Sequence, residues 1–434
     1  MMSPSRFNVV IYGATGITGG KIFETLVSSA RFDAFSVAVA GRSERKLREV
    51  IGNAEKLTGK PLENKIGVLI CDATDATSMA RMARRAELIV NAVGPFRLHG
   101  EAVVRAAVEN GAHQIDVAGE PEWIERMEDE YAARARENGV IVVSACGWDS
   151  IPADLSVAML KKQFDGQLLW IDAFVQLHFG ESGYSFSATS LHALLLGFNG
   201  AAVPASDLGA VRRRIMPRTL VPDETKAVAS GHLPKRSTLW RIDDDGGWAL
   251  PFLGADKSIV TRSQYYEAVN EGVPMVHFNP YAKFDSRWNA ITLALGMSLL
   301  KVAAQKQSLH NWILKHPSLV SGNMFSEEGP TEQQMREATF TYKFEGYGYG
   351  RGDSREEKPK KRMLVTCHGP DVGYIATSAC VLSSVLVFLR EKEKLPKRGG
   401  VYTTATAFRT SRILDYLADF GINFDIEFPR LSKL

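Results

Sequence analysis

The chain has 434 residues, of which 45% are hydrophobic and 23% are charged, a composition typical of globular proteins and not of disordered or fibrous ones. Its formal net charge of +3 is too small to indicate nucleic acid as a partner. The four cysteines stand far apart and form no CxxC motif, which argues against a disulfide framework and against a structural zinc site.

The first predicted element is a strand over residues 7–13, an apolar and β-branched run that ends in Gly13. The next residues have helical spacing, so the motif Gly13-x-x-Gly16-x-x-Gly19 lies between a strand and a helix. In this context a glycine loop presents backbone N–H groups and the positive end of a helix dipole to a pyrophosphate. We therefore predict a dinucleotide-binding loop, with a plain strand–turn–helix corner as the alternative. Its candidate residues are Gly13, Thr15, Gly16, Ile17, Thr18 and Gly19.

The second predicted strand, over residues 35–43, ends in Gly41-Arg42-Ser43. Enzymes that use NAD usually carry an acidic residue near this point to bind the ribose 2′-hydroxyl, whereas an arginine accommodates the 2′-phosphate of NADP. This strand end holds Arg42 and Ser43 and no Asp or Glu. The sequence therefore favours NADPH (NADP) as the cofactor, with NAD as the alternative. A surface charge without a ligand is the other interpretation of Arg42.

Strands and helices continue to alternate through the first third of the chain. The strands are predicted over 66–74, 87–96, 113–120 and 140–149, and the helices over 44–57, 75–85, 101–110 and 122–138. Strands rich in Val and Ile that alternate with helices predict an α/β fold with a Rossmann-type, doubly wound parallel sheet, in which cofactors bind beyond the carboxyl ends of the strands. That rule adds residues at strand ends to the candidate cofactor site, namely Asp72, Asn91, Val93, Gly94 and Pro95.

After residue 155 the pattern changes to several strands with few long helices between them. Strands are predicted over 170–179, 258–269, 274–280, 337–348 and 362–369, with a helix over 187–198 and a polar hairpin loop over 351–362. This pattern indicates a second, α+β domain built on a mixed or antiparallel sheet. We therefore expect a Rossmann domain over 1–155, an α+β substrate or dimerisation domain over 156–400, and a C-terminal segment over 401–434 with a strand–helix–strand pattern.

Several motifs carry a family likeness. They are VVIYGATGITGG, AGRS, NAVGPF, DVAGE and CGWDSIPADLS in the N-terminal part, with residues 326–348 and 369–408 further on. With these motifs the chain resembles the saccharopine dehydrogenase-like oxidoreductases, which include trans-acting enoyl reductase-type proteins, over most of its length. The resemblance implies an NAD(P)-dependent oxidoreductase whose C-terminal segment packs near the cofactor domain. It leaves the substrate open, because SGYSFSATS (182–190) departs from the Gly- and Thr-rich composition of relatives.

Two uncharged stretches test whether the chain contacts a membrane. Residues 288–300 fall short of the roughly 20 residues that a helix needs to span a bilayer, and residues 372–389 are at the lower limit. The second stretch includes Thr377, Ser378, Ser383 and Ser384. The resemblance places it as a buried helix of the second domain, so we predict a core helix, with peripheral membrane contact as the alternative.

Hydride transfer needs an oriented cofactor and a proton donor, but no nucleophile and no metal. Asp116 and Glu120 lie on the predicted rim, and the candidate catalytic residues are Asp149, Ser150 and Tyr184. Two interpretations compete for Asp149: an acid or base whose pKa is raised by burial, or a helix N-cap. The N-cap, formed by Asp149 or Ser150 ahead of Pro152, is favoured. The histidines lack the spacing of a metal site.

The favoured hypothesis is an NADPH-dependent oxidoreductase that reduces a C=N, C=C or C=O bond of a small or lipid-like substrate. The alternative is a non-catalytic, dinucleotide-binding scaffold associated with membranes or lipids. A second copy of the chain is a further candidate partner. The chain stops at Ser432-Lys433-Leu434, a tripeptide that the peroxisomal import receptor recognises. This tail predicts a peroxisomal location, or a glycosomal one where the source has glycosomes.

Overall fold

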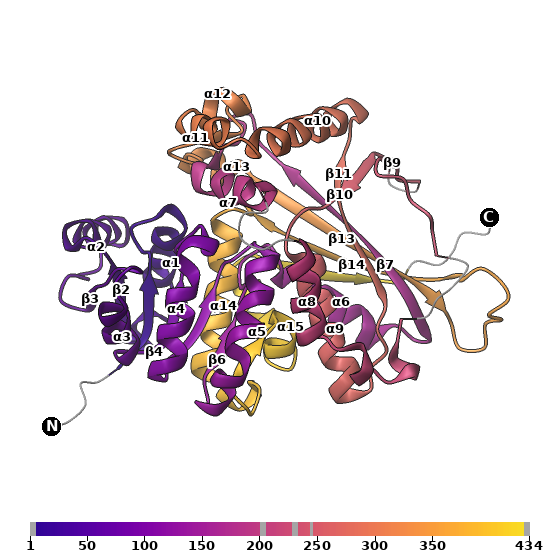
Figure 1. The fold of residues 1–434 in the computed structure, drawn as a ribbon, viewed down its shortest axis with the longest axis horizontal. Helices are drawn as coiled ribbons and strands as arrows, with labels where there is room; N and C mark the ends of the chain where they lie inside the picture. Colours follow the sequence, from indigo (N-terminus) through magenta and orange to yellow (C-terminus); the bar gives the residue numbers. More distant parts are fainter. Residues whose placement is uncertain (1–5, 200–204, 228–232, 244–245, 429–434) are drawn as a thin grey trace.

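The computed structural model describes residues 6–199, 205–227, 233–243 and 246–428. Within these ranges the chain forms two seven-stranded sheets that lie side by side (Figure 1). The first sheet is parallel throughout, in the order β15-β6-β5-β4-β1-β2-β3. Its strands are β1 (Phe7–Tyr12), β2 (Val37–Gly41), β3 (Ile66–Ile70), β4 (Ala86–Asn91), β5 (His113–Asp116), β6 (Ile141–Val143) and β15 (Gly400–Tyr402).

Helices connect consecutive strands of this sheet, as the alternating pattern predicts. They are α1 (Ile17–Ser28), α2 (Glu44–Thr58), α3 (Ala76–Arg84), α4 (Phe96–Asn110) and α5 (Pro121–Glu137). In β1, Val9 and Ile11 belong to one hydrophobic cluster, whereas Val10 and Tyr12 belong to another. Both faces of the strand are therefore covered, which is why its sequence is continuously apolar. The predicted Rossmann-type parallel sheet is confirmed.

The second sheet is mixed, in the order β16-β14-β13-β7-β11-β10-β9. Strands β7 and β11 pair in parallel, and the other neighbours are antiparallel. The polar loop over 351–360 joins β13 to β14 as a hairpin. The strands are β7 (Gln167–His178), β9 (Trp240–Arg241), β10 (Trp248–Pro251), β11 (His277–Phe284), β13 (Thr339–Tyr349), β14 (Lys361–Pro370) and β16 (Asn423–Glu427). The predicted second domain on a mixed sheet is confirmed.

One predicted strand of the second domain, over 258–269, is wrong, because these residues lie in the helix α9 (Asp256–Glu271). The run is rich in β-branched and aromatic residues, which favours a strand by local propensity alone. In the structure, however, Ile259, Val260, Ser263 and Ala268 are buried at helical spacing, and Gly272 closes the helix in the left-handed conformation. Burial of one helical face therefore outweighs the local preference.

The C-terminal part of the chain is divided between the two sheets. Strand β15 pairs with β6, and β16 pairs with β14. The helices that surround these strands are α14 (Ile375–Arg390), α15 (Thr404–Phe408) and α16 (Ile413–Asp419). Helix α14 contacts α1, strands β4 and β5 of the first sheet, and β14 of the second sheet.

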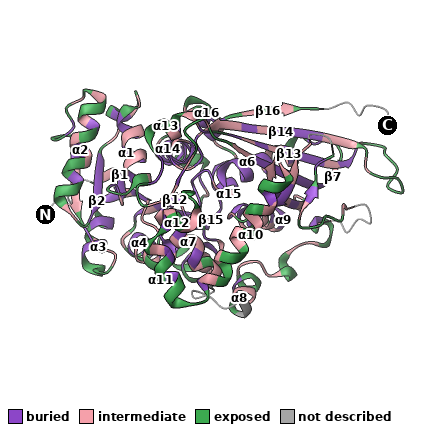
Figure 2. Ribbon diagram, turned by 90° about the horizontal axis from the view of Figure 1, so that it is seen from above, coloured by how far each residue is buried: buried purple, intermediate pink, exposed green. Residues whose placement is uncertain are grey.

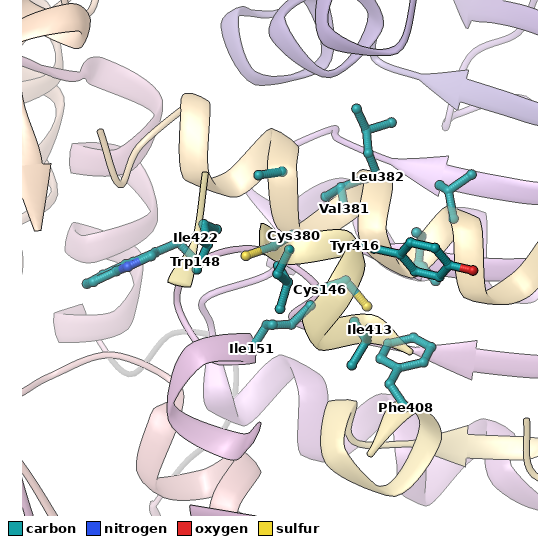
Figure 3. Packing of buried hydrophobic residues seen from close by; sticks show 14 of the residues in the cluster. Cys146, Trp148, Ile151, Cys380, Val381, Leu382, Phe408, Ile413, Tyr416 and Ile422 are labelled. Carbon is teal, nitrogen blue, oxygen red and sulfur yellow. The ribbon is translucent and has the colours of Figure 1, made fainter. Parts of the chain in front are cut away.

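A single hydrophobic cluster joins the two domains across α14. It includes Cys146 before α6 (Ile151–Gln163), Cys380 and Val381 in α14, and Phe408 in α15, which are packed together in Figure 3. Because apolar area removed from water stabilises a fold by roughly 25 cal/mol per Å², this shared core couples the two domains.

A helical lobe extends from the second sheet (Figure 1). Its elements are β8 (Phe186–Ser187), α7 (Ala188–Asn199), α10 (Arg287–Ala304), α11 (Gln307–Lys315), α12 (Pro317–Ser321), β12 (Phe325–Ser326) and α13 (Glu332–Glu337). Helix α8 (Ala205–Ile215) packs instead against α5 of the first domain. Over the described ranges, no helix combines the length and the apolar character that crossing a bilayer requires.

Candidate dinucleotide-binding site

The three glycines after β1 have different surroundings. Gly13 has a φ of +89°, and a Cβ atom there would lie 2.5 Å from Cγ2 of Val93. A Cβ atom at Gly19 would overlap the carbonyl oxygen of Gly13. At Gly16 the nearest atom would be 3.4 Å away, and the residue is exposed. Gly13 thus makes the tight turn, Gly19 lets the helix pack on the loop, and Gly16 leaves the backbone open to a ligand.

The helix that follows begins without a side-chain cap. Gly16 is the N-cap residue of α1 and supplies no side-chain hydrogen bond, and the first turn carries no acidic residue. Thr15, Gly16 and Ile17 are exposed at the tip of the loop. N–H groups at a helix N-terminus, together with the helix dipole, favour an anion. The loop therefore fits a diphosphate.

The loop after β4 lies directly beside the glycine loop. The Ala92 N–H donates to the Tyr12 carbonyl (2.9 Å), and the Val93 N–H donates to Oδ1 of Asn91 (3.1 Å). Asn91 is fully buried, and its Nδ2 has no partner among the described residues. A buried donor without a partner is uncommon, because leaving it unpaired costs free energy. This donor lies at the end of β4, directly beneath the loop over 91–94.

Arg42 is exposed at the end of β2, next to the end of β1. Burial raises the pKa of Tyr12 to about 12. The charge of Asp72 raises this pKa further and the charge of Arg42 lowers it, so both side chains lie near Tyr12. Hydrogen bonds from the N–H (2.9 Å) and hydroxyl (2.8 Å) of Thr74 lower the pKa of Asp72. The Ser43 hydroxyl accepts from the Lys46 N–H (3.4 Å) and so caps α2.

The predicted cofactor residues thus lie along one edge of the parallel sheet. The strand register places Tyr12 beside Ala40 and Asn91, and Asn91 beside Asp116, so the carboxyl ends of the central strands are level. Two of the predicted residues face inward: Gly19 packs on the loop, and Pro95 is the buried N-cap residue of α4. The edge carries the glycine loop, Arg42, Asp72 and the loop over 91–94.

Two carboxylates on the rim hold the loops in place. Asp116 accepts hydrogen bonds from the N–H groups of Ala118 and Ala145 (both 3.0 Å), and burial raises its pKa to about 6. Glu120 accepts from the N–H groups of Phe96 (2.8 Å) and Arg97 (3.1 Å), which begin α4. Both residues therefore satisfy backbone donors around the site.

Asp149 belongs to a buried pair of carboxyl groups. Burial raises its pKa to about 6, and burial together with the charge of Asp149 raises the pKa of Asp256 well above its ordinary value. Tyr342 donates to Oδ2 of Asp256 (2.6 Å), and the two carboxyl groups are hydrogen-bonded to each other. Two carboxyls in such surroundings share a proton.

The favoured N-cap interpretation of Asp149 and Ser150 is wrong. Ser150 stands at the N-cap position of α6 but makes no side-chain cap bond, and Oδ2 of Asp149 instead accepts from the N–H of Ala255 at 3.4 Å. Ser150 is fully buried, and its hydroxyl has no partner within the described ranges. The strand end that carries these residues turns into the core of the second domain, which the local sequence does not show.

Tyr184, the third catalytic candidate, is half-buried and donates a hydrogen bond to Oδ1 of Asp371. Burial and the neighbouring Asp371 carboxylate raise the Tyr184 pKa far above its ordinary value, so the hydroxyl keeps its proton. Oδ2 of Asp371 accepts from the N–H groups of Tyr374 (2.7 Å) and Ile375 (2.9 Å) at the start of α14. The pair therefore connects the 182–190 segment to α14.

The second domain meets the cofactor edge at two glycines. A Cβ atom at Gly94 would lie 3.4 Å from Cγ2 of Thr189. A Cβ atom at Gly329 would contact Cδ1 of Ile17 (2.9 Å), the Tyr374 hydroxyl (3.4 Å) and Cβ of Ser187 (3.7 Å). The exposed end of the glycine loop thus faces the start of α7 and the start of α14.

Sequence reasoning missed Asp371, Tyr374 and Thr189 as neighbours of the site. The signal available for Asp371 was its place in GPDVGY, just ahead of a long apolar helix, where an aspartate caps the first N–H groups. No local pattern links Tyr374 to Gly329, because these residues meet only through the fold.

The fold and this edge define a class: a two-domain α/β protein whose parallel sheet binds a dinucleotide at its carboxyl end. Residues 9–143 match the family model described as the saccharopine dehydrogenase NADP binding domain. The chain is 34% identical to the saccharopine dehydrogenase-like oxidoreductase of Mus musculus, with 97% of each chain covered. It is 49% identical to a Caenorhabditis elegans protein named lipid droplet localized protein, with 98% of this chain and 99% of that one covered.

The chain belongs to the saccharopine dehydrogenase-like oxidoreductase family, as its motifs predicted. Among solved structures it is similar to the apo saccharopine dehydrogenase (L-Glu forming) of Saccharomyces cerevisiae, with a TM-score of 0.57 over 97% of this chain and 100% of that one. The sequence identity there is 12%, so this likeness concerns the fold alone.

The predicted peroxisomal or glycosomal location is wrong. The Caenorhabditis elegans relative, aligned over nearly the full length, is named for lipid droplets. The prediction rested on Ser432-Lys433-Leu434, which lies outside the described residues. A three-residue tail carries far less information than a match along the whole chain.

Proposed function

We propose that the protein is an NADPH-dependent reductase that acts on a C=N, C=C or C=O bond of a small or lipid-like molecule. The observation that carries this proposal is the glycine loop, whose open backbone at Gly16 lies one strand away from the exposed Arg42. Family membership supports the oxidoreductase class.

The preference for NADPH over NADH depends on Arg42. A guanidinium binds a phosphate through two parallel charged hydrogen bonds, which an uncharged ribose hydroxyl cannot match. Within the described ranges Arg42 forms no ion pair with a carboxylate, so its charge is available to a ligand. The sequence Gly41-Arg42-Ser43 also lacks the acidic residue that would repel a 2′-phosphate.

When bound, the nicotinamide supplies the hydride. The loop N–H groups would hold the pyrophosphate, and Arg42 would hold the 2′-phosphate. Ile17 at the tip of the glycine loop and Ser187 and Tyr374 of the second domain, which together surround Gly329, are uncharged, which supports a neutral acceptor. Of the three catalytic candidates, Ser150 is fully buried and the carboxyl of Asp149 is held in the pair with Asp256, whereas Tyr184 is partly exposed, so we assign substrate contact to the Tyr184 hydroxyl.

The test has two parts. Isothermal titration with NADPH and with NADH measures both dissociation constants, and we expect tighter binding of NADPH. Oxidation of NADPH is then followed by nicotinamide absorbance with panels of aliphatic aldehydes, ketones, enones and imines. Absence of NADPH binding at millimolar cofactor would overturn the proposal. Tyr184→Phe should retain NADPH binding and lose turnover; unchanged turnover would remove Tyr184 from the reaction.

A second candidate function is a non-catalytic, dinucleotide-binding scaffold on a lipid surface. Two observations favour it: the exposed apolar helices α10 to α12, and the relative named for lipid droplets. We propose the lipid droplet surface as the location under either function. NADPH binding without turnover of any panel member would favour the scaffold.

A further inference from the structure

Helix α10 presents an apolar stripe to solvent. Trp288, Leu295, Leu299 and Val302 are exposed by 74%, 60%, 71% and 70%. Their spacing of seven, four and three residues places them on one face of the helix. Only Ala290 and Ala304 of this helix are buried. The face therefore has no partner among the described residues.

The apolar surface continues on the next two helices. Leu309 and Trp312 are exposed on α11, Leu319 on α12, and Met324 just after it. Eight of the sixteen exposed large hydrophobic residues that the structure describes fall within 288–324. Such a concentration marks an interaction surface and not scattered exposure. Figure 1 shows these helices together along the top of the molecule, and in Figure 2, which views this side from above, much of their surface is exposed.

The charges of this surface are mostly positive, with Glu327 and Glu328 at its margin, where they line a hollow with Lys315 and Leu319. Residues 286–326 contain Arg287, Lys301, Lys306 and Lys315 and no Asp or Glu. All four cations are exposed, and none is paired with a carboxylate within the described part of the chain. The whole chain, by contrast, carries 49 acidic residues, so their absence from this segment is a local property.

The lobe is a preformed platform. Leu191 and Leu195 of α7 pack with Ala304, Ile313 and Phe325 in a hydrophobic cluster of their own. The helices α10 and α11 thus have an anchored inner side and an exposed outer side. Their outer side can contact a surface without rearrangement of the fold.

We propose that the outer face of α10–α12 docks on an anionic phospholipid surface, such as the monolayer of a lipid droplet or one leaflet of a bilayer. Exposed leucines enter the acyl boundary, Trp288 and Trp312 lie at the headgroup level, and the four cations bind lipid phosphates. A second copy of the chain would bring the four cations of each copy to one interface, with Glu327 and Glu328 at its margin to offset them, so a lipid surface fits the excess of positive charge better. This proposal does not depend on NADPH chemistry.

Flotation of the full-length protein with vesicles of phosphatidylcholine and phosphatidylserine tests the proposal. Wild type should float with the vesicles, and the double variant Leu295→Asp/Leu299→Asp should show at least about a tenfold lower bound fraction. Leu57→Asp, on a residue of α2 that is 65% exposed, is the matched control and should float like wild type. NADPH binding should be the same in all three proteins, which separates failure here from failure of the proposed function.

The cations predict a salt effect. Lys301→Glu/Lys306→Glu should reduce binding to vesicles with phosphatidylserine by several-fold and change binding to pure phosphatidylcholine less, and added salt should weaken wild-type binding. A wild-type protein that stays with the soluble fraction would overturn the proposal. A second outcome would also overturn the proposal: wild type is a dimer, and Leu299→Asp dissociates the dimer but still binds vesicles. In that case the face binds a second copy of the chain and not lipid.

A spectroscopic measurement covers the case in which the aspartate variants fold poorly. Lipids brominated in the acyl chain should quench tryptophan fluorescence of wild type, and Trp288→Phe should lose a measurable share of that quenching. Equal quenching in both proteins would contradict contact through α10.

Discussion

Two apolar helices of similar length have opposite environments in this protein. In α14 every residue from Ala376 to Phe388 is buried, between the parallel sheet and the mixed sheet. In α10, Ala290 and Ala304 alone are buried, and the outer face is open. An apolar sequence therefore does not specify burial; the number of elements that surround the helix does.

The small residues of α14 explain how it fits between two sheets. Small residues occupy positions 376–380 of the helix and again 383–384, and they allow close approach of neighbours. The hydroxyls of Ser383 and Ser384 donate to the carbonyls of Ala379 (2.8 Å) and Cys380 (2.9 Å), so they add no unpaired polar group to the core. Helix α10 instead carries Trp288 and charged residues at its ends, which suit an interface.

The largest expected effect comes from the same substitution made in each helix. Val381 of α14 is fully buried, whereas Val302 of α10 is 70% exposed. Val381→Asp should cost more than about 4 kcal/mol of unfolding free energy, because it buries an unpaired charge. Val302→Asp should change it by less than about 0.5 kcal/mol. Thermal unfolding and soluble yield measure both; similar losses would contradict the contrast between the helices.

Replacing a helical glycine should have opposite effects at a packed position in α1 and at an open position in α10. Gly19→Ala would drive a methyl group into the Gly13 carbonyl, so we expect a loss of about 1–3 kcal/mol in stability and weaker NADPH binding. Gly296 in α10 has nothing within 4 Å of its Cβ position. Gly296→Ala should therefore stabilise the protein by up to about 1 kcal/mol. Thermal unfolding and cofactor titration of both variants decide whether their effects have opposite signs.

Buried charge near α14 predicts a pH dependence. Burial raises the pKa of Asp149 to about 6 from an ordinary 3.8, so the folded state holds this proton more tightly than the unfolded state. Its stabilising contribution is complete below about pH 4 and disappears as the pH rises through 6. Asp149→Asn should thus flatten the curve of unfolding free energy against pH. At pH 8 the unfolding free energy of the variant should be about 1–3 kcal/mol higher than that of wild type. Asp33→Asn, at an exposed position, is the control.

An exposed charge gives the smallest change in stability and a specific change in binding. Arg42→Asp should weaken NADPH binding by about 1–3 kcal/mol while leaving NADH binding nearly unchanged. Arg45→Asp is the matched control, because Arg45 is exposed one turn further on and pairs with Glu49 at 2.5 Å. Calorimetric titration of both cofactors measures the effect; an equal loss for both cofactors would mean that Arg42 does not contact the 2′-phosphate.

Much of the fold could be predicted because it depends on local patterns. The strand, glycine and helix signals around Gly13 and Gly19 come from neighbouring residues, and the structure places them at one edge of the sheet. The helix over 258–269 could not be predicted from its β-branched composition, since its burial depends on packing with distant elements. The site residues themselves stay predictions until a cofactor is titrated.

The sequence by itself determined the alternation of strands and helices, the glycine loop and the family, because each is encoded by residues a few positions apart. The tertiary structure alone decided that α14 is enclosed and α10 is open, that Asp149 pairs with Asp256, and that Tyr184 bonds to Asp371. In the last two cases the paired residues are more than a hundred positions apart in the sequence. Desolvation and packing are set by everything around a group, and no short stretch of chain contains that information.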